Sequence, residues 1–296
     1  MALYVQTNTS SINSQRMLAR STRQLDTSYE RLSSGLRINS AKDDAAGLQI
    51  SNRMASQING LTQGNRNAND GISMCQVTEG ALDEVTSMLQ RIRTLAIQSA
   101  NGTNSSAERI AINEEVQQLI KEVRRVGTDT SYGGNLKILG PDVSDTVFQV
   151  GSNAYQTISL TMKSLSKLVT VTASVNILNS SGNTAATIDP NTTLSNMTVT
   201  SADDSQKTIA FMSEIIRQVD SYRAELGAVQ NRMESTISNQ ENVIENVSDA
   251  RSRIRDVDYA VETANMTQQS IIQQASTTIL TQANQKTQIA LNLLQG

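Results

Sequence analysis

The stretch SNQENVIENVSDARSRIRDVDYAVETANMT, residues 238–267, carries an apolar stripe with no proline or glycine to interrupt it. Its aliphatic residues recur at steps of four, seven, three and four: Val243, Val247, Ile254, Val257 and Val261. Mixed steps of three and four keep side chains on one face of an α-helix. The spacing therefore predicts long helical structure whose apolar face needs a partner.

The same spacing continues towards the N-terminus of this stretch through Met212, Ile216, Val219, Tyr222, Leu226, Val229, Met233 and Ile237. A helix from about 209 to 257 would span roughly 75 Å at 1.5 Å per residue. The first half of the chain predicts three more helical segments, over about 2–40, 43–100 and 107–126. Breaks are expected at Asn101–Gly102 and at Gly127, so long helices dominate the predicted fold.

The middle of the chain has a different composition. TVFQVGSNAYQTISLTM (146–162) and LVTVTASVNIL (168–178) are rich in β-branched residues that partly alternate, which favours β-hairpins. Residues 180–205 are polar and predict a loop with a turn at Asp189–Pro190, and Gly133–Gly134 predicts a tight turn. The expected fold is mainly α: a long antiparallel helical hairpin or coiled-coil rod with a small β-hairpin region in the middle.

Composition excludes histidine-dependent catalysis. The 296 residues contain no histidine, so Ser-His-Asp, Cys-His and HExxH sites are impossible. The carboxylate pairs Asp43–Asp44 and Glu114–Glu115 are sequence neighbours that point about 100° apart on a helix. No GK[ST] or GxGxxG phosphate motif is present, and the only cysteine, Cys75, lies in an apolar stretch typical of buried thiols. No catalytic, cofactor-binding or metal site is predicted.

Charge and hydropathy restrict the possible partners. The net charge is −3 with basic and acidic residues interspersed, so no nucleic-acid surface is predicted. No run of about eighteen apolar residues predicts membrane insertion. The first residues, MALYVQTNTSSINSQR, lack the pattern of a cleaved signal peptide. These rules alone predict a cytoplasmic protein.

The two terminal segments cannot be stable alone. Ordering costs about 1.5 kcal/mol per residue, and an isolated helix has little to bury against. We therefore expect residues 1–40 and the last forty residues to pair as a coiled coil and to bury their other faces against copies of the chain. The candidate assembly residues are Ile12, Leu18, Leu25, Leu32, Leu36, Ile279, Leu291, Leu293 and Leu294.

Several motifs carry a family resemblance. They are SSGLRINSAKDDAAGLQISNRM (33–54), QRIRTLAIQSANGTNS (90–105), SYGGNLKILG (131–140), FQVGSNAYQTI (148–158), RAELGAVQNRMESTISN (223–239) and QANQKTQIALNLLQG (282–296). In this order they closely resemble bacterial flagellin, the subunit of the flagellar filament. The resemblance covers roughly residues 1–160 and 205–296, which leaves only the middle without a signature.

The resemblance implies a division of the chain. Residues 1–42 and 258–296 would form the helices of an inner tube. Residues 43–140 and 206–257 would form the two halves of an outer-tube helical domain. Residues 141–205 would form β-hairpins and a short variable surface segment.

The resemblance also implies a function and replaces the cytoplasmic localisation. Flagellins are exported unfolded, without a cleaved signal peptide, by the type III flagellar export apparatus, and they polymerise outside the cell for swimming motility. The implied partners are copies of the same chain, sister flagellins, cap and junction proteins, and an export chaperone at the C-terminal tail. No cofactor is implied.

One surface motif resembles the part of flagellin that a vertebrate Toll-like innate immune receptor recognises. Arg91, Leu95 and Glu115 occupy the matching positions, and the same residues would also serve subunit packing. Two other functions stay open at this point. They are a hook–filament junction protein, which would share the terminal signatures, and a cytoplasmic coiled-coil scaffold, which would not explain SYGGNLKILG.

Overall fold

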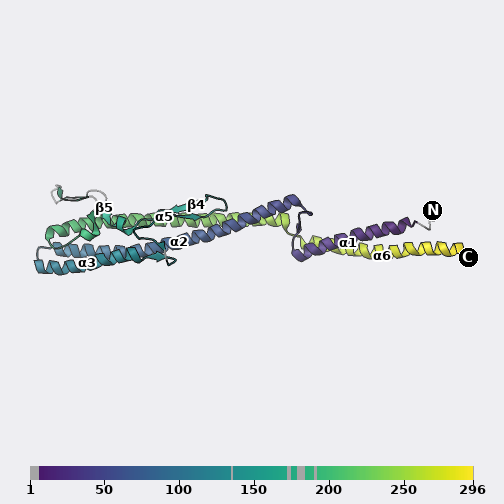
Figure 1. The fold of residues 1–296 in the computed structure, drawn as a ribbon, viewed down its shortest axis with the longest axis horizontal. Helices are drawn as coiled ribbons and strands as arrows, with labels where there is room; N and C mark the ends of the chain where they lie inside the picture. Colours follow the sequence, from purple (N-terminus) through teal and green to yellow (C-terminus); the bar gives the residue numbers. More distant parts are fainter. Residues whose placement is uncertain (1–6, 135, 172–174, 179–183, 190–191, 296) are drawn as a thin grey trace. The chain divides into compact units, whose positions relative to one another are not determined.

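The structure is a computed structural model that describes residues 7–134, 136–171, 175–178, 184–189 and 192–295. Figure 1 shows its elements along the chain. The helices are α1 (Thr9–Ser34), α2 (Ala45–Ala100), α3 (Ser106–Asp129), α4 (Leu165–Leu168), α5 (Ala202–Arg255), α6 (Tyr259–Gln295) and the 3-10 helix η1 (Leu194–Asn196). The expected mainly α fold with small antiparallel strand pairs is confirmed.

Contacts divide the chain into two compact units. The terminal unit combines Met1–Ile58 with Val243–Gly296, and the central unit comprises Asn59–Asn242. Each is described below by itself.

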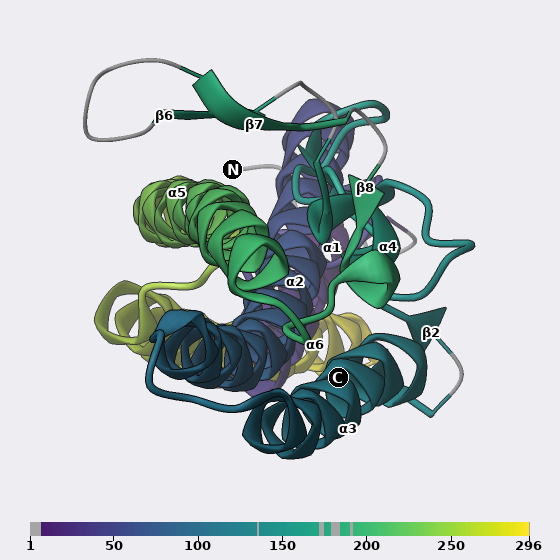
Figure 2. The ribbon, with the colours of Figure 1, turned by 90° about the vertical axis from the view of Figure 1, so that its left-hand side faces the viewer.

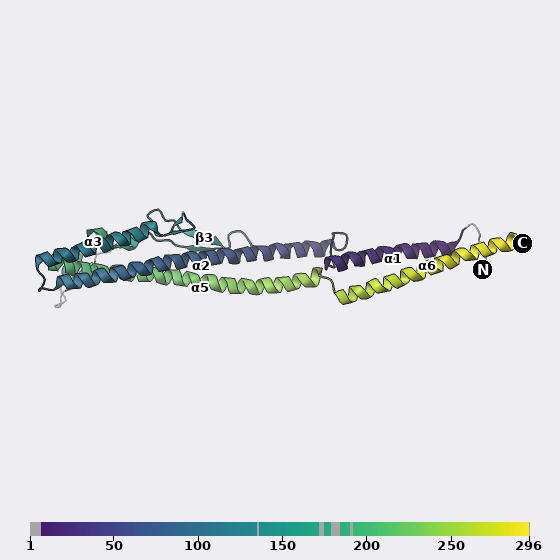
Figure 3. The same ribbon diagram turned by 90° about the horizontal axis from the view of Figure 1, so that it is seen from below.

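In the terminal unit, α1 and α6 lie side by side and antiparallel (Figures 1 and 3). The Ser11 hydroxyl donates to the Asn284 side-chain oxygen at 2.9 Å, and the Ser28 hydroxyl donates to the Glu262 carboxylate at 2.5 Å. The two helices pair residues from opposite ends of the sequence, as the terminal segments were expected to do.

The ends of α1 have identifiable local causes. Asn8 caps the first turn, because its side-chain oxygen accepts from the Ser11 N–H at 3.1 Å. The helix ends at Gly35, whose φ of +71° is left-handed and whose N–H donates to the Arg31 carbonyl. Glycine tolerates this conformation without a Cβ clash, so the chain can turn sharply there.

The stripe quoted at 238–267 crosses a break between two helices, although it contains no proline or glycine. A backbone bridge between Leu36 and Asp256 interrupts α5, and the Val257 N–H donates to the Gly35 carbonyl at 3.0 Å. The Asp258 carboxylate then accepts from the N–H groups of Ala260 and Val261 at 2.9 and 3.2 Å. This aspartate cap starts α6, so the helix predicted over about 209–257 ends at Arg255.

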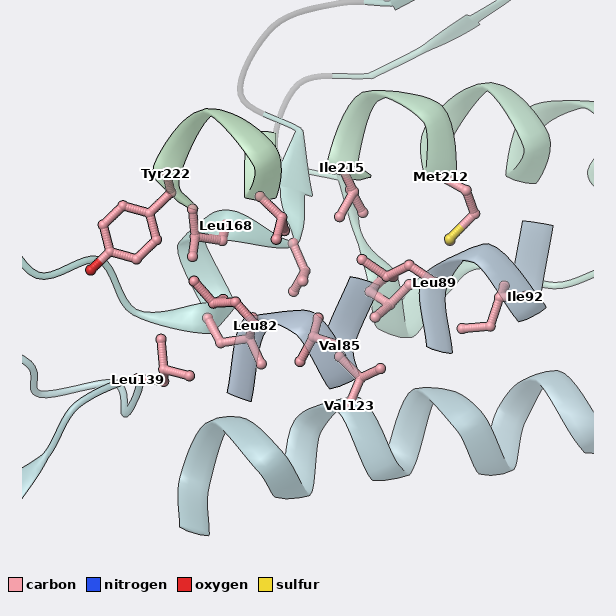
Figure 4. Close-up of a cluster of buried hydrophobic side chains, with 14 of the residues drawn as sticks. Leu82, Val85, Leu89, Ile92, Val123, Leu139, Leu168, Met212, Ile215 and Tyr222 are labelled. Atoms are coloured by element: carbon pink, nitrogen blue, oxygen red, sulfur yellow. The ribbon is translucent and has the colours of Figure 1, made fainter. Parts of the chain in front are cut away.

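In the central unit, α2 packs against both α3 and α5, which Figure 2 shows end-on. Ion pairs join Arg91 to Glu115 on α3 and Asp83 to Arg223 on α5. Between the helices lies one apolar core, in which side chains from all three point towards one another (Figure 4). The α2 residues predicted for this stripe are 0–2 % exposed: Leu82, Val85, Leu89, Ile92 and Leu95.

Short strand pairs lie beside these helices. Strands β1 (Ser131–Tyr132) and β2 (Leu136–Lys137) pair across the predicted double-glycine turn, where Gly133 and Gly134 have φ of +62° and +89°. Strands β3 (Thr146–Gln149) and β4 (Thr157–Leu160) form an antiparallel hairpin in which Thr146 faces Leu160. Strands β6 (Val175–Leu178) and β7 (Thr184–Ile188) form another. The predicted hairpins are therefore present.

The prediction of a polar loop over 180–205 is wrong for much of this segment. It contains β7, then β8 (Thr192–Thr193), which pairs with β5 (Thr170–Val171), then η1. The Leu194 N–H donates to the Val169 carbonyl at 3.2 Å, and the Leu194 side chain is buried. Helix α5 already begins at Ala202, because the Ser201 hydroxyl accepts from the Asp204 N–H at 3.1 Å. Residues 180–183 and Pro190 lie outside the described residues.

Gly127 does not end its helix, as the sequence had suggested. Helix α3 continues to Asp129, and a Cβ at Gly127 would lie 2.8 Å from Leu165 Cδ2. The glycine therefore provides room for α4 to pack closely and does not mark a helix end.

Candidate functional site

The seam between α1 and α6 is made of small polar side chains. On α1 the buried positions are Ser11, Ser14, Ser21 and Ser28, of which the last three are spaced seven residues apart. On α6 they include Ser276 and Ala283, also seven residues apart. This is the repeat of a coiled coil, but the seam positions hold small groups where a coiled coil usually holds aliphatic ones. Little apolar surface is buried inside the pair.

The predicted assembly residues surround this seam and do not fill it. Leu18, Leu25 and Leu32 each follow a seam serine by four residues and are half-buried, as is Leu36. Ile12 and Ile279 are 56 % and 54 % exposed. The serine heptad, offset from the leucines by four residues, occupies the seam itself. The role of these apolar residues in assembly stays a prediction.

The side chains of Leu291, Leu293 and Leu294 lie outside the described residues, so their assembly role stays a prediction.

Both helices of the pair present large apolar side chains to solvent. The exposed ones on α1 are Ile12, Met17 and Tyr29, and those on α6 are Tyr259, Val261, Ile271, Ile272, Ile279 and Ile289. A shallow hollow runs along α6 from Tyr259 to Ile272. Exposed apolar surface of this extent is typical of protein–protein interaction sites.

A buried carboxylate sets the register of the pair. Glu262 is 6 % exposed and accepts from the Ser28 hydroxyl at 2.5 Å, with Arg31 Nη1 3.6 Å from its other oxygen. Seven residues away on each helix, the Ser21 hydroxyl donates to the Gln269 carbonyl at 2.8 Å. A shift of either helix along the other would leave the carboxylate buried without its partners, which is costly.

The second candidate surface lies on α2 and α3. Arg91 donates through Nε and Nη2 to one Glu115 oxygen, at 3.0 and 2.7 Å, and both side chains are about half exposed. Leu95 is only 2 % exposed, in the core between α2 and its neighbours. In the isolated chain this side chain is covered, and a receptor contact by Leu95 stays a prediction. The apolar stripe from Leu82 to Leu95 already indicated this burial.

The other residues considered for chemistry have structural roles. The Asp43 carboxylate accepts from the Ser40 N–H at 2.9 Å, and the hydrogen bonds from the Ser40 backbone and hydroxyl lower its pKa. The Asp44 carboxylate accepts from the Gly47 N–H at 2.9 Å and caps α2. Glu114 and Glu115 are exposed on α3. Each carboxylate of the two pairs is therefore accounted for by capping or by a solvated helix face.

Cys75 is a buried core residue, as its sequence context predicted. It is 0 % exposed, and burial, with a smaller contribution from Glu79, raises the pKa of its thiol to about 11. A thiol with that pKa is not a nucleophile at neutral pH. Among the residues that the structure describes, no cluster of His, Cys, Asp and Glu could hold a metal ion.

In the described part of the chain, no helix combines the length and the apolar character needed to cross a membrane.

Comparison with known proteins gives a consistent result along the chain. Residues 5–139 match the bacterial flagellin N-terminal helical region, and residues 209–294 match the bacterial flagellin C-terminal helical region. Flagellin A of Vibrio cholerae serotype O1 is 38 % identical over 380 aligned positions, which cover 100 % of both chains. B-type flagellin of Pseudomonas aeruginosa is 55 % identical over 166 positions, covering 56 % of this chain and 34 % of that protein. Helices α1, α2 and α3 lie within the first matched region, and the second contains most of α5 and nearly all of α6.

Proposed function

Because this chain belongs to the bacterial flagellin family, we propose that it polymerises into the flagellar filament through the outward apolar faces of α1 and α6. The family makes it a structural subunit of an extracellular filament and not an enzyme. Beyond the family membership, the proposal specifies the surface through which the subunits bind one another.

The observation that carries the proposal is the arrangement of the terminal pair. Serine and alanine occupy its seam, while Ile12, Ile271 and Ile279 face solvent at 56 %, 61 % and 54 % exposure. Burying one such side chain contributes about 1.5–3 kcal/mol. The pair therefore leaves large apolar side chains available to be buried against other subunits.

The test is seeded polymerisation of purified monomer, followed by circular dichroism and negative-stain microscopy. We expect filaments from the unsubstituted chain and none, or far fewer, from Ile12→Asp and Ile279→Asp. Thr281→Asp adds the same charge at an exposed position on the opposite side of α6 from Ile279 and serves as the matched control. Normal filaments from both isoleucine variants would show that this face is not the assembly surface.

We further propose that the chain leaves the cell unfolded through the type III flagellar apparatus, without cleavage of a signal peptide. Its polar seam supports this proposal, because a pair that buries little apolar surface opens at low cost. A chaperone would cover the tail that includes Leu291, Leu293 and Leu294 before export. Deleting residues 286–296 should abolish binding to a flagellin export chaperone, and mass spectrometry of secreted chain should find an unprocessed N-terminal region.

In the filament, the proposed neighbours besides identical copies are sister flagellins, the cap and the junction proteins. A hook–filament junction function is not favoured, because both terminal regions match flagellin and Flagellin A of Vibrio cholerae aligns with this chain over its whole length.

Recognition by a vertebrate Toll-like innate immune receptor is a second proposal, favoured by the exposed Arg91–Glu115 pair. Two half-exposed charges held in one geometry present a defined polar contact to a partner. Released monomer carrying Arg91→Ala or Glu115→Ala should activate receptor reporter cells about tenfold less. Arg217→Ala removes an exposed ion pair with Glu214 on α5 and should have no effect.

A further inference from the structure

Tyr155 is the most unusual side chain on the central unit. It is 95 % exposed, in the turn between β3 and β4, and its φ is +65°. Among the described residues it is the only non-glycine residue with a positive φ. A large residue rarely adopts this conformation, because its Cβ crowds the following carbonyl.

Hydrogen bonds inside the turn hold Tyr155 in this position. The Gln149 amide donates to the carbonyls of Gly151 and Asn153 at 2.9 and 2.6 Å. The Asn153 N–H donates to the Gln156 side-chain oxygen at 3.1 Å. The turn is therefore closed by its own hydrogen bonds and displays one aromatic ring.

The base of the turn is also fixed to the helices. Asn67 of α2 donates to the Gln149 carbonyl, and Gln240 of α5 donates to the Val150 carbonyl, both at 2.8 Å. Gly64 permits this approach, since a Cβ there would overlap the Val150 carbonyl oxygen. These contacts hold the strained backbone of Tyr155 in place although its side chain faces solvent. Such strain is typical of functional sites, which indicates that Tyr155 binds another molecule.

An apolar groove of about 290 Å³ lies elsewhere on the same unit, between α3, α4 and η1. Its floor contains Ile120, Val123, Leu139, Leu165, Val169 and Leu194, and its polar rim contains Arg124, Thr128, Ser166 and Ser195. The volume is at the lower end for pockets that hold small molecules, which suits one aromatic side chain. Arg124 contacts the Ser195 hydroxyl and so lies at the mouth.

Tyr155 cannot reach this groove within its own chain. The turn lies against Gly60 and Gly64 of α2. The Arg91–Glu115 pair and the Tyr132–Asp70 hydrogen bond show that α3 runs antiparallel to α2, which places the groove near residues 78–86 of α2. Roughly twenty helical residues, or roughly 30 Å, separate the two sites. Only a second molecule can join them.

We propose that Tyr155 of one subunit inserts into the α3–α4 groove of a neighbouring subunit. The ring would lie on the apolar floor, its hydroxyl would meet the serine rim, and the Arg124 guanidinium would cover its face. Tyrosine and arginine dominate interface hot spots, and a guanidinium over an aromatic ring is attractive. This contact rests on the proposed polymerisation and adds to it a site on the central unit.

The geometry of the contact agrees with a filament. A projection and a groove at different places on one molecule form a heterologous interface, which propagates as an open helix when its rotation does not close. The separation of the two sites also predicts that neighbouring central units are staggered by roughly 30 Å along the direction of α2.

The decisive experiment is a cross-link between two singly substituted chains. Monomers carrying Tyr155→Cys and Ser195→Cys are copolymerised on native seeds and exposed to a mild copper-based oxidant, which accepts the two electrons of disulfide formation. We expect a disulfide-linked dimer of unlike chains in filaments and none in monomer mixtures. Cys75 should not interfere because it is buried. Ser235→Cys, at an exposed position of α5, replaces Ser195→Cys in the matched control and should give no dimer.

A second pair of variants separates contact from folding. Tyr155→Gly removes the ring and relieves the positive φ, so its monomer should unfold at the same or a higher temperature than the unsubstituted chain. Its critical concentration for polymerisation should nevertheless rise about 10- to 30-fold, while Tyr155→Phe should change it less than about threefold.

Native-like polymerisation of Tyr155→Gly together with absence of the cross-link would overturn the contact and leave the proposed function standing. Failure of the unsubstituted chain to polymerise on seeds would instead count against the proposed function itself.

Discussion

The terminal and central units use the same helical repeat in opposite ways. In the central unit the seam between helices is filled by large side chains such as Leu89, Phe211 and Tyr222, all 0 % exposed. In the terminal unit the seam is filled by Ser14, Ser21 and Ser28, while Ile12 and Ile279 face solvent. Heptad spacing thus locates the faces of a helix, but side-chain size decides which face is satisfied within the chain.

The difference has an energetic consequence. A buried aliphatic side chain contributes about 1.5–3 kcal/mol, whereas a hydrogen bond such as those of the serine seam contributes about 1 kcal/mol net. We therefore expect the central unit to be the more stable one and the terminal helices of the monomer to open first.

The largest effect should come from the central core. Phe211→Ala removes a fully buried ring and should lower the free energy of unfolding by about 3–5 kcal/mol, because the cavity is only partly refilled. Urea unfolding of the monomer, followed by circular dichroism, measures this loss. Ile12→Ala, at a residue that is 56 % exposed, should leave the monomer curve in place. Equal losses for the two variants would abolish the distinction between the units.

The next effect concerns small residues in the central unit. Gly64→Ala should destabilise the unit by about 3 kcal/mol, because the new Cβ meets backbone at Val150 and not a flexible side chain. Gly80 lies on the same helix, and a Cβ added there would have no neighbouring atom within 4 Å. Gly80→Ala should therefore stabilise by about 0.5–1 kcal/mol, from helix propensity. The opposite signs can be read from thermal unfolding midpoints.

The third effect is a dependence of the stability of the central core on pH. The pKa of the Cys75 thiol is raised to about 11 in the folded chain from 9.0, so between these values the unfolded chain has lost a proton that the folded chain keeps. Stability from this group is complete below pH 9 and falls as the pH rises towards 11, by about 2 kcal/mol.

Chemical denaturation at pH 8, 9, 10 and 11 measures this loss, and Cys75→Ala should show a shallower decline. Parallel curves for the two proteins would mean that the thiol is not shielded as its burial indicates.

The smallest effect probes the terminal seam. Ser28→Ala removes the hydrogen bond to the buried Glu262 carboxylate and should weaken the α1–α6 pair by about 1.5 kcal/mol. Hydrogen exchange of α1 amides should report it, while amides of the central core should not change. Ser33→Ala, at an exposed position of the same helix, should be neutral or slightly protective. A larger response to Ser33→Ala would rule out the seam assignment.

Local and periodic features could be predicted from the sequence. The stripe from Leu82 to Leu95 is buried as expected, and helix α2 ends at Ala100, beside the predicted break at Asn101–Gly102. Gly133 and Gly134 form the expected turn because both need left-handed backbone.

Features that depend on distant residues could not be predicted. The pairing of β5 with β8 joins segments about twenty residues apart, and periodicity does not show which strands pair. The serine seam was missed because serine does not count as an apolar residue, although Ser14, Ser21 and Ser28 follow the same seven-residue step as the leucines. Tyr155 and the α3–α4 groove carry no sequence pattern, since one is a strained turn and the other is assembled from three elements.

The hydrogen bond between Ser11 and Asn284 spans 273 residues of sequence. A ribosome therefore completes α1 long before its partner α6 exists, and closing so long a loop is entropically slow. The central unit can fold from nearer neighbours in the meantime. The terminal pair is thus the last part of the chain to find its partner, and proteolytic trimming at either end removes the partner of the other.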